Sequence, residues 1–136
     1  CLEITESGAM EEAPAVLDNL NQLRQMGVLL AIDDYGTGYS SLSYVRKLPI
    51  SELKIDQSFI KHMIDSPNDV MIVRSTIELA HSLGFRVVAE GVETQAISQT
   101  LADFGCDFAQ GYFYARPLPF DDYVAWLQQQ GTPSRA

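Results

Sequence analysis

Two adjacent aspartates, Asp33 and Asp34, follow the apolar run of residues 28–32 and precede the glycine-containing segment of residues 35–41. Such a run is typical of a strand that is covered on both faces, and α/β folds carry their chemistry at the carboxyl ends of parallel strands. Two neighbouring carboxylates repel each other unless protons or cations intervene. Because a divalent cation with oxygen ligands removes that repulsion, the pair predicts a metal site.

The same pattern, a short apolar stretch that ends in a charged or amide side chain, occurs four more times. These stretches span residues 2–6, 53–56, 86–90 and 107–110. Helical periodicity lies between them, over residues 16–25, 41–47, 59–64, 70–83 and 95–104, and a last amphipathic helix is expected at about 121–129. Strands that alternate with helices predict a parallel sheet with right-handed crossovers.

Residues that favour helix ends support these boundaries. Gly27, Gly84 and Gly105 each follow a helical pattern and precede a strand, where a left-handed C-cap is expected. Thr94 is placed to cap the helix that follows it. The segment 67–69, Pro-Asn-Asp, predicts a turn and cap before the helix of residues 70–83.

Length and charge limit the fold and the partners. The 136 residues supply about five strand-helix units, whereas an eight-unit barrel needs roughly 200–250 residues. The chain begins with Cys1 inside a predicted strand, so we expect part of a larger domain whose open edges favour a homodimer or pairing with the missing half. The net charge of −9 excludes duplex nucleic acid as a partner, although metals would let a small phosphate ester bind.

The cysteines and the hydropathy pattern are less informative. Cys1 and Cys106 lack the spacing of a metal site, and we expect both to be reduced. No apolar run approaches the roughly 18 residues of a membrane helix, and the N-terminus does not resemble a signal peptide. Neither absence describes the parent protein, which is either soluble or membrane-anchored, and a cytoplasmic face is expected for this domain only from the family resemblance that follows.

The motifs resemble, in order and spacing, those of the EAL-domain family of bacterial cyclic-di-GMP phosphodiesterases. The resemblance extends to about Gln129, and Tyr35 stands where the family usually has Phe. The Glu-Ala-Leu motif itself and a metal-binding Asn would lie before Cys1. The matching segments are Glu3-Ile4-Thr5-Glu6, Asp33-Asp34-Tyr35-Gly36-Thr37-Gly38-Tyr39-Ser40-Ser41-Leu42, Lys54-Ile55-Asp56, Glu90-Gly91-Val92-Glu93-Thr94, Gln110-Gly111-Tyr112 and Arg116-Pro117-Leu118.

This resemblance implies an α/β fold, a partial TIM-type barrel of about five parallel strand-helix units. Residues 1–130 would form the C-terminal portion of an EAL domain, and residues 131–136 a mobile tail. The complete domain would hydrolyse one phosphodiester of cyclic di-GMP with two Mg²⁺ or Mn²⁺ ions and release the linear dinucleotide. We expect the two-metal site to be unoccupied, and hydrolysis to be absent, in the isolated segment.

The family's functional residues transfer to matching positions of this chain. The resemblance implies metal ligands at Glu3, Asp33, Asp34 and Glu90, with Asp33 bridging the two metals. It implies catalytic roles for Lys54, Asp56, Glu90 and Gln110, with Lys54 near the attacked phosphate. It implies loop anchoring and coupling to dimerisation for Glu6, Gly36, Thr37, Gly38 and Ser40. It implies substrate contacts for Glu93, Tyr112, Arg116 and Pro117.

Simpler structural roles compete with several of these functions. Asp34 could be only a helix cap, and Lys54 only a solvated lysine, although its spacing from Asp56 places both on one face of a strand. For the aromatic residues 112–114 we favour core packing over guanine stacking. His62 and His81 match no motif, and we expect structural or solvent-facing roles for both. At the level of function, the alternative to hydrolysis is a non-catalytic cyclic-di-GMP receptor.

Overall fold

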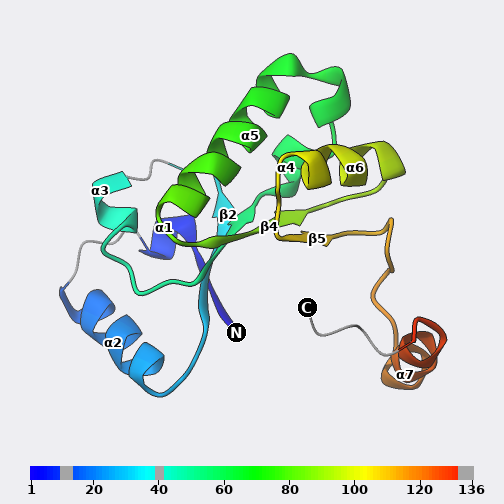
Figure 1. Cartoon of the computed structure of the whole chain (residues 1–136). Coiled ribbons are helices and arrows are strands. Elements are labelled where there is room, and N and C mark those ends of the chain that lie inside the picture. The colour runs from blue at the N-terminus through cyan, green and yellow to red at the C-terminus, as the bar shows by residue number, and fades with distance from the viewer. Residues whose placement is uncertain (10–13, 39–41, 132–136) are drawn as a thin grey trace.

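The computed structural model describes residues 1–9, 14–38 and 42–131. Within these residues the chain forms one five-stranded sheet, in which every neighbouring pair of strands is parallel and the order is β1-β2-β3-β4-β5 (Figure 1). The prediction of a parallel α/β fold is confirmed. The strands are β1 (Leu2–Thr5), β2 (Leu30–Tyr35), β3 (Glu52–Ile55), β4 (Arg86–Glu90) and β5 (Phe108–Gln110).

Helices alternate with the strands, as the periodicity predicts. They are α1 (Glu6–Ala9), α2 (Pro14–Gln25), α3 (Leu42–Val45), α4 (Gln57–Ile60), α5 (Pro67–Ser82), α6 (Gln95–Asp103) and α7 (Phe120–Gln129), and η1 (Met63–Asp65) is a short 3₁₀ helix. Two expectations were wrong. Helix α1 was not predicted, and the single helix expected at residues 59–64 is divided between α4 and η1.

The core lies between the sheet and the helices that follow β3 and β4. Figure 1 shows α4, α5 and α6 gathered on one side of the sheet. Ile32 on β2, Ile55 on β3 and Val87 on β4 are fully or almost fully buried, and Ile77 on α5 belongs to the same apolar cluster. Burial of such side chains stabilises the fold by about 1.5–3 kcal/mol each. The rigid sheet fixes the positions of the residues at its carboxyl edge.

Most predicted helix ends are confirmed. The backbone is left-handed at Gly27, Gly84 and Gly105, with φ between 76° and 85°, and the Thr94 hydroxyl accepts a hydrogen bond from the N–H of Ile97. One prediction was wrong: the segment 67–69 is the first turn of α5 rather than a turn before it. The cap is Ser66, and Pro67 occupies the first helical position, where its missing N–H costs nothing.

A polar network joins the amino ends of β3, β4 and β5. The Asp107 carboxylate accepts a hydrogen bond from the Val87 N–H at 2.8 Å and lies 2.7 Å from His81 Nε2, while Arg86 pairs with Glu52 at 2.8 Å. Burial alone would raise the pKa of Asp107, but the hydrogen bonds from His81 and Val87 outweigh it and lower that pKa. His81 therefore has a structural role, as expected.

The C-terminal part of the described chain is exposed. None of the residues of α7, all of which are described, is buried, and Figure 1 shows α7 apart from the sheet. Tyr112, Phe113 and Tyr114 are 53%, 42% and 44% exposed, so the preference for core packing was wrong. Of the expected tail, residues 131–136, all but Gly131 lie outside the described residues.

Two further sequence expectations can be compared with the structure. Cys1 and Cys106 are both free, and burial raises the pKa of the Cys106 thiol to about 11. Among the residues that the structure describes, no helix combines the length and the apolarity needed to cross a bilayer.

Candidate metal centre

Strand pairing brings the predicted site residues to one edge of the sheet. Thr5 of β1 pairs with Asp33 of β2, and Glu90 of β4 pairs with Gln110 of β5. Strand β2 does not end before the aspartates, as the sequence suggested, but continues through both to Tyr35 with an irregular register. This bulge gives Asp34 a left-handed backbone, with φ of 56°. Such strain is uncommon for a residue other than glycine and is often found at functional sites.

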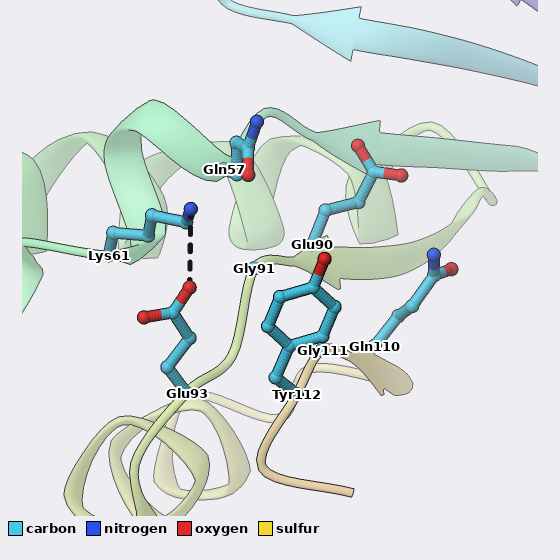
Figure 2. Close-up of a pocket in the computed structure, with 8 residues that line it drawn as sticks. All are labelled: Gln57, Lys61, Glu90, Gly91, Glu93, Gln110, Gly111 and Tyr112. Atoms are coloured by element: carbon cyan, nitrogen blue, oxygen red, sulfur yellow. Dashed lines mark ion pairs between the residues drawn. The ribbon is translucent and has the colours of Figure 1, made fainter. Parts of the chain in front are cut away.

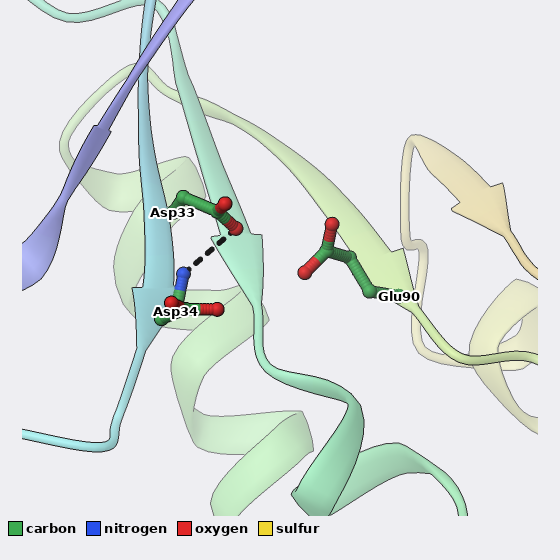
Figure 3. A group of neighbouring side chains, drawn as sticks. All are labelled: Asp33, Asp34 and Glu90. Carbon is green, nitrogen blue, oxygen red and sulfur yellow. Dashed lines mark hydrogen bonds between the residues drawn. The ribbon is translucent and has the colours of Figure 1, made fainter.

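Three carboxylates meet at this edge. Asp33, Asp34 and Glu90 each offer an oxygen within 4.8 Å of the other two, and Figure 3 shows Glu90 reaching toward the aspartate pair from the neighbouring part of the sheet. The Asp34 N–H donates to Asp33 Oδ1 at 2.8 Å, which fixes the Asp33 side chain. The charge of Asp33 is the main cause of a raised pKa at Asp34, and partial burial adds to it. A hard cation with oxygen ligands fits this donor set.

Lys54 balances part of this negative charge. It is 5% exposed, and its Nζ lies 2.6 Å from Glu3 Oε1, 2.8 Å from Glu90 Oε1 and 3.9 Å from Asp33 Oδ1. Burial alone would lower the pKa of Lys54, but the hydrogen bonds to Glu3 and Glu90 outweigh it, so that pKa is raised and the amine stays charged. At Glu90, burial is the largest influence and raises the pKa, while Lys54 opposes it.

Glu3 and Asp56 lie differently from the sequence expectation. Glu3 is about half exposed and pairs with Lys54 rather than joining the three-carboxylate cluster. Asp56 caps α4 by accepting a hydrogen bond from the Ser58 N–H at 2.8 Å. Lys54 contacts Glu3 and Glu90, while Asp56 lies near Asp34 and contributes to the raised pKa of that residue. That Lys54 and Asp56 act together in one site stays a prediction. Burial would raise the pKa of Asp56, but the hydrogen bonds from Ser58 lower it.

Glu6 is almost fully buried, and its carboxylate holds the loop that follows β2. Its Oε2 accepts hydrogen bonds from the N–H groups of Gly36 and Gly38, at 3.1 and 3.0 Å. The Thr37 hydroxyl donates to the Asp34 carbonyl at 2.7 Å and closes the turn. This geometry agrees with an anchoring role for Glu6, while the coupling of the loop to dimerisation stays a prediction. Ser40, predicted in the same loop, lies outside the described residues.

A pocket extends the site beyond the carboxylates. Figure 2 shows Glu90 and Gln110 on one side of it and an ion pair between Lys61 and Glu93 on the other. Gln57 at the start of α4 and Lys61 at its end also line this pocket, and neither was predicted from the sequence. Their only sequence signal is that they follow Asp56 by one and five residues, on a helix that begins at the site. The remaining lining residues are Gly91, Gly111 and Tyr112.

A second, more apolar hollow adjoins the pocket and shares Gln110 and Tyr112 with it. The Arg116 guanidinium stacks over the Tyr112 ring, 4.4 Å from its centroid. Pro117 and Trp126 also line this hollow. The predicted substrate residues after β5 are therefore brought together, next to the carboxylate cluster rather than within it.

Comparison with known proteins identifies the class to which this fold and site belong. The family model of the EAL domain matches residues 1–117. The chain belongs to the EAL-domain family, and its parallel α/β fold is of the TIM-barrel type found in solved EAL domains.

Two relatives from Pseudomonas aeruginosa illustrate the similarity in sequence. The bifunctional diguanylate cyclase/cyclic di-GMP phosphodiesterase MucR is 48% identical over 124 residues, which cover 91% of this chain and 18% of MucR. The cyclic di-GMP phosphodiesterase PA2567 is 42% identical over 128 residues, which cover 94% of this chain and 22% of that protein. The chain thus spans less than a quarter of the length of either relative.

Solved structures show the same similarity in three dimensions. The complex of the MucR phosphodiesterase with c-di-GMP matches with a TM-score of 0.86 at 48% identity, covering 90% of this chain and 49% of that one. The manganese and cyclic di-GMP complex of BlrP1 from Klebsiella pneumoniae matches with a TM-score of 0.77 at 35% identity, covering 85% of this chain and 29% of that one.

Proposed function

We propose that the protein containing this chain is a metal-dependent phosphodiesterase that hydrolyses cyclic di-GMP to the linear dinucleotide. The observation that carries the proposal is the cluster of Asp33, Asp34 and Glu90 with the buried Lys54 beside it. The names of MucR and PA2567 as cyclic di-GMP phosphodiesterases support it. The BlrP1 complex, which contains manganese and cyclic di-GMP, supports a metal cofactor.

Asp33, Asp34 and Glu90 would hold the metal, which we propose to be Mg²⁺ or Mn²⁺. Their carboxylate oxygens already converge, and the bulged backbone at Asp34 turns that side chain beside Asp33. When bound, such ions polarise a phosphoryl oxygen and lower the pKa of water. Glu3 pairs with Lys54 through Oε1 at 2.6 Å and lies outside this set of three. Its second carboxylate oxygen would be the one to reach a metal, and for Glu3 the role of a ligand stays a proposal.

The other residues of the site would bind and orient the phosphodiester. The charged amine of Lys54 is placed to offset negative charge that grows on phosphorus during attack. Gln110, opposite Glu90 at the sheet edge, offers an amide that can orient water or a phosphate oxygen. Tyr112 and Arg116 form a flat, cationic surface in the adjoining hollow, which suits stacking of a guanine base.

The test of this function is an assay of the complete protein with cyclic di-GMP. We expect release of the linear dinucleotide with Mg²⁺ or Mn²⁺ and none after treatment with a chelator. Tight binding of cyclic di-GMP without hydrolysis under both metals would instead support a non-catalytic receptor. Hydrolysis that is unaffected by a chelator would contradict the role of the carboxylate cluster.

We also propose that the two open sheet edges are covered in the working protein by a second copy or by further chain. The exposure of Leu2 on β1 and Phe108 on β5, at 47% and 48%, supports this. Light scattering of residues 1–136 alone should show association, and a stable monomer at micromolar concentration would argue against it. We propose that this domain lies on the cytoplasmic side of a parent protein that is either soluble or membrane-anchored.

A further inference from the structure

An ion pair spans the pocket beside the carboxylate cluster. Lys61, at the end of α4, places its Nζ 3.2 Å from Oε1 of Glu93, which lies in the loop after β4. Figure 2 shows the two side chains extended toward each other across one side of the pocket. They are 36% and 44% exposed, so the pair contributes little to overall stability. Glu93 lies only three residues after Glu90, so the ion pair is placed to act locally on the carboxylate site instead.

The loop that carries Glu93 passes very close to α4. Gly91 has φ of 77°, and a Cβ there would lie 2.6 Å from Cβ of Gln57 and 3.4 Å from Cε of Lys61. The stem of Lys61 therefore crosses directly over Gly91 before its amine reaches Glu93. Only glycine allows this approach, because any side chain would push the loop away from the helix.

The opposite side of the same loop is bonded to the segment around β5. The Val92 N–H donates to the Gln110 carbonyl at 3.1 Å, and the Val92 carbonyl accepts from the Phe113 N–H at 3.0 Å. Val92 is fully buried. The loop is thus held by backbone hydrogen bonds on one side and by the Lys61–Glu93 pair on the other. Glu90, the last residue of β4, pairs with Gln110 and leads directly into this loop.

We infer that Lys61 and Glu93 form a clasp that sets the position of Glu90 in the carboxylate cluster. Glu93 is then a positioning residue rather than the substrate contact that the sequence suggested, and Lys61 acquires a role in the same site. The inference rests on the proposed function for its kinetic consequences. Its effect on metal affinity follows from the geometry alone, since a displaced Glu90 is a poorer ligand whatever the substrate.

A double-mutant cycle in the complete protein tests the clasp. The variants are Lys61→Met, Glu93→Gln and the two together, with affinity for Mn²⁺ measured by titration and kcat and KM measured with cyclic di-GMP. We expect each single variant to lower Mn²⁺ affinity and kcat by about tenfold at an unchanged KM. The double variant should lose no more than either single one, because one broken pair is the whole effect.

A charge exchange and a control complete the design. Lys61→Glu with Glu93→Lys in one protein should recover most of the affinity and kcat that either reversal alone removes. The control pair is Arg74 and Glu78 on α5, which are joined at 3.0 Å and are well exposed. Exchanging these two residues should change neither the affinity for Mn²⁺ nor kcat.

Several outcomes would overturn the clasp. Multiplicative losses in the double variant would show that Lys61 and Glu93 act separately. A raised KM on Glu93→Gln alone, with Lys61→Met unaffected, would return Glu93 to the role of substrate contact. If the wild-type protein binds Mn²⁺ but does not hydrolyse cyclic di-GMP, the proposed function fails, and the Mn²⁺ affinities still decide the clasp.

Discussion

Lys54 is the residue on which the charge balance of the site depends. It places one amine among Glu3, Glu90 and Asp33 at the end of the sheet. Without a metal, loss of this amine leaves the carboxylates to repel one another. The same amine also has to serve the phosphodiester, so its removal has two separable consequences.

The first prediction concerns Lys54→Met in the complete protein. In the presence of a chelator, we expect the free energy of unfolding to fall by about 1–3 kcal/mol, toward the lower end because Glu3 is half exposed. Denaturant unfolding measures this, and Lys47→Met, at an exposed lysine, is the control. An unchanged unfolding free energy would show that the ion pairs of Lys54 are not stabilising.

Asp34 combines a carboxylate of the cluster with a left-handed backbone, and the two contributions can be separated. Asp34→Gly and Asp34→Ala both remove the carboxylate, but alanine must keep φ of 56° with a Cβ. We expect Asp34→Gly to be more stable than Asp34→Ala by about 1 kcal/mol in denaturant unfolding, with weak metal binding in both. Equal stability of the two variants would mean that the bulge relaxes and stores no strain.

At the residue level, sequence reasoning found the carboxylates of the cluster more readily than their contacts. Asp33 and Asp34 stand out as a strand-ending pair, and the family resemblance added Glu90. Lys54 was expected to share a face with Asp56, two residues on, whereas it contacts Glu3, 51 residues away. Long-range contacts of this kind depend on strand register, which the sequence pattern leaves open.

At the level of elements, the two ends of the sheet have different roles. The carboxyl end carries the strained and charged site, while the amino end carries the network of Asp107, His81 and Val87 that ties β5 to β4 and α5. Because the pKa of Asp107 is lowered, the stability that this network contributes depends on pH. A carboxyl group with a depressed pKa contributes stability above its unfolded pKa, and loses that contribution as the pH falls through the folded value.

The third prediction follows from the direction of this pKa shift. Asp107→Asn should lower the unfolding free energy at pH 7, and the difference from wild type should shrink as the pH falls below about 4, where the carboxylate is protonated in the unfolded chain. Chemical denaturation between pH 3 and pH 7 measures both proteins. Asp121→Asn, on the exposed helix α7, should follow the wild-type curve. A constant difference over the whole range would contradict the linkage.

The elements themselves were largely predictable, since hydrophobic periodicity and glycine caps are local signals. The failures occur where a side chain overrides the pattern. Asp56 caps α4, which begins two residues before the expected start. The helix then ends at Ile60 and η1 follows, where Met63 is fully buried. Strand β2 continues through Asp33 and Asp34 because pairing with β3 resumes at Tyr35. Each of these features depends on a neighbouring element.

At the scale of the whole molecule, the sheet gathers residues from all five described strands at one edge. Glu3 and Gln110 lie on the outermost strands, and the carboxylate cluster lies between them on β2 and β4. Length alone predicted about five parallel units, and the described residues form a sheet of five parallel strands. The exposure of the aromatic residues after β5 was not predictable, because aromatic composition does not reveal which surfaces meet.

The central claim, that the carboxylate cluster makes the protein a metal-dependent phosphodiesterase, is tested most directly by Asp33→Asn in the complete protein. The substitution keeps the side-chain volume but removes the charge that lies within reach of Asp34, Glu90 and Lys54. Hydrolysis of cyclic di-GMP should fall by at least about 100-fold with Mg²⁺ or Mn²⁺, whereas Asp121→Asn keeps full activity. Near wild-type hydrolysis by Asp33→Asn would contradict the account.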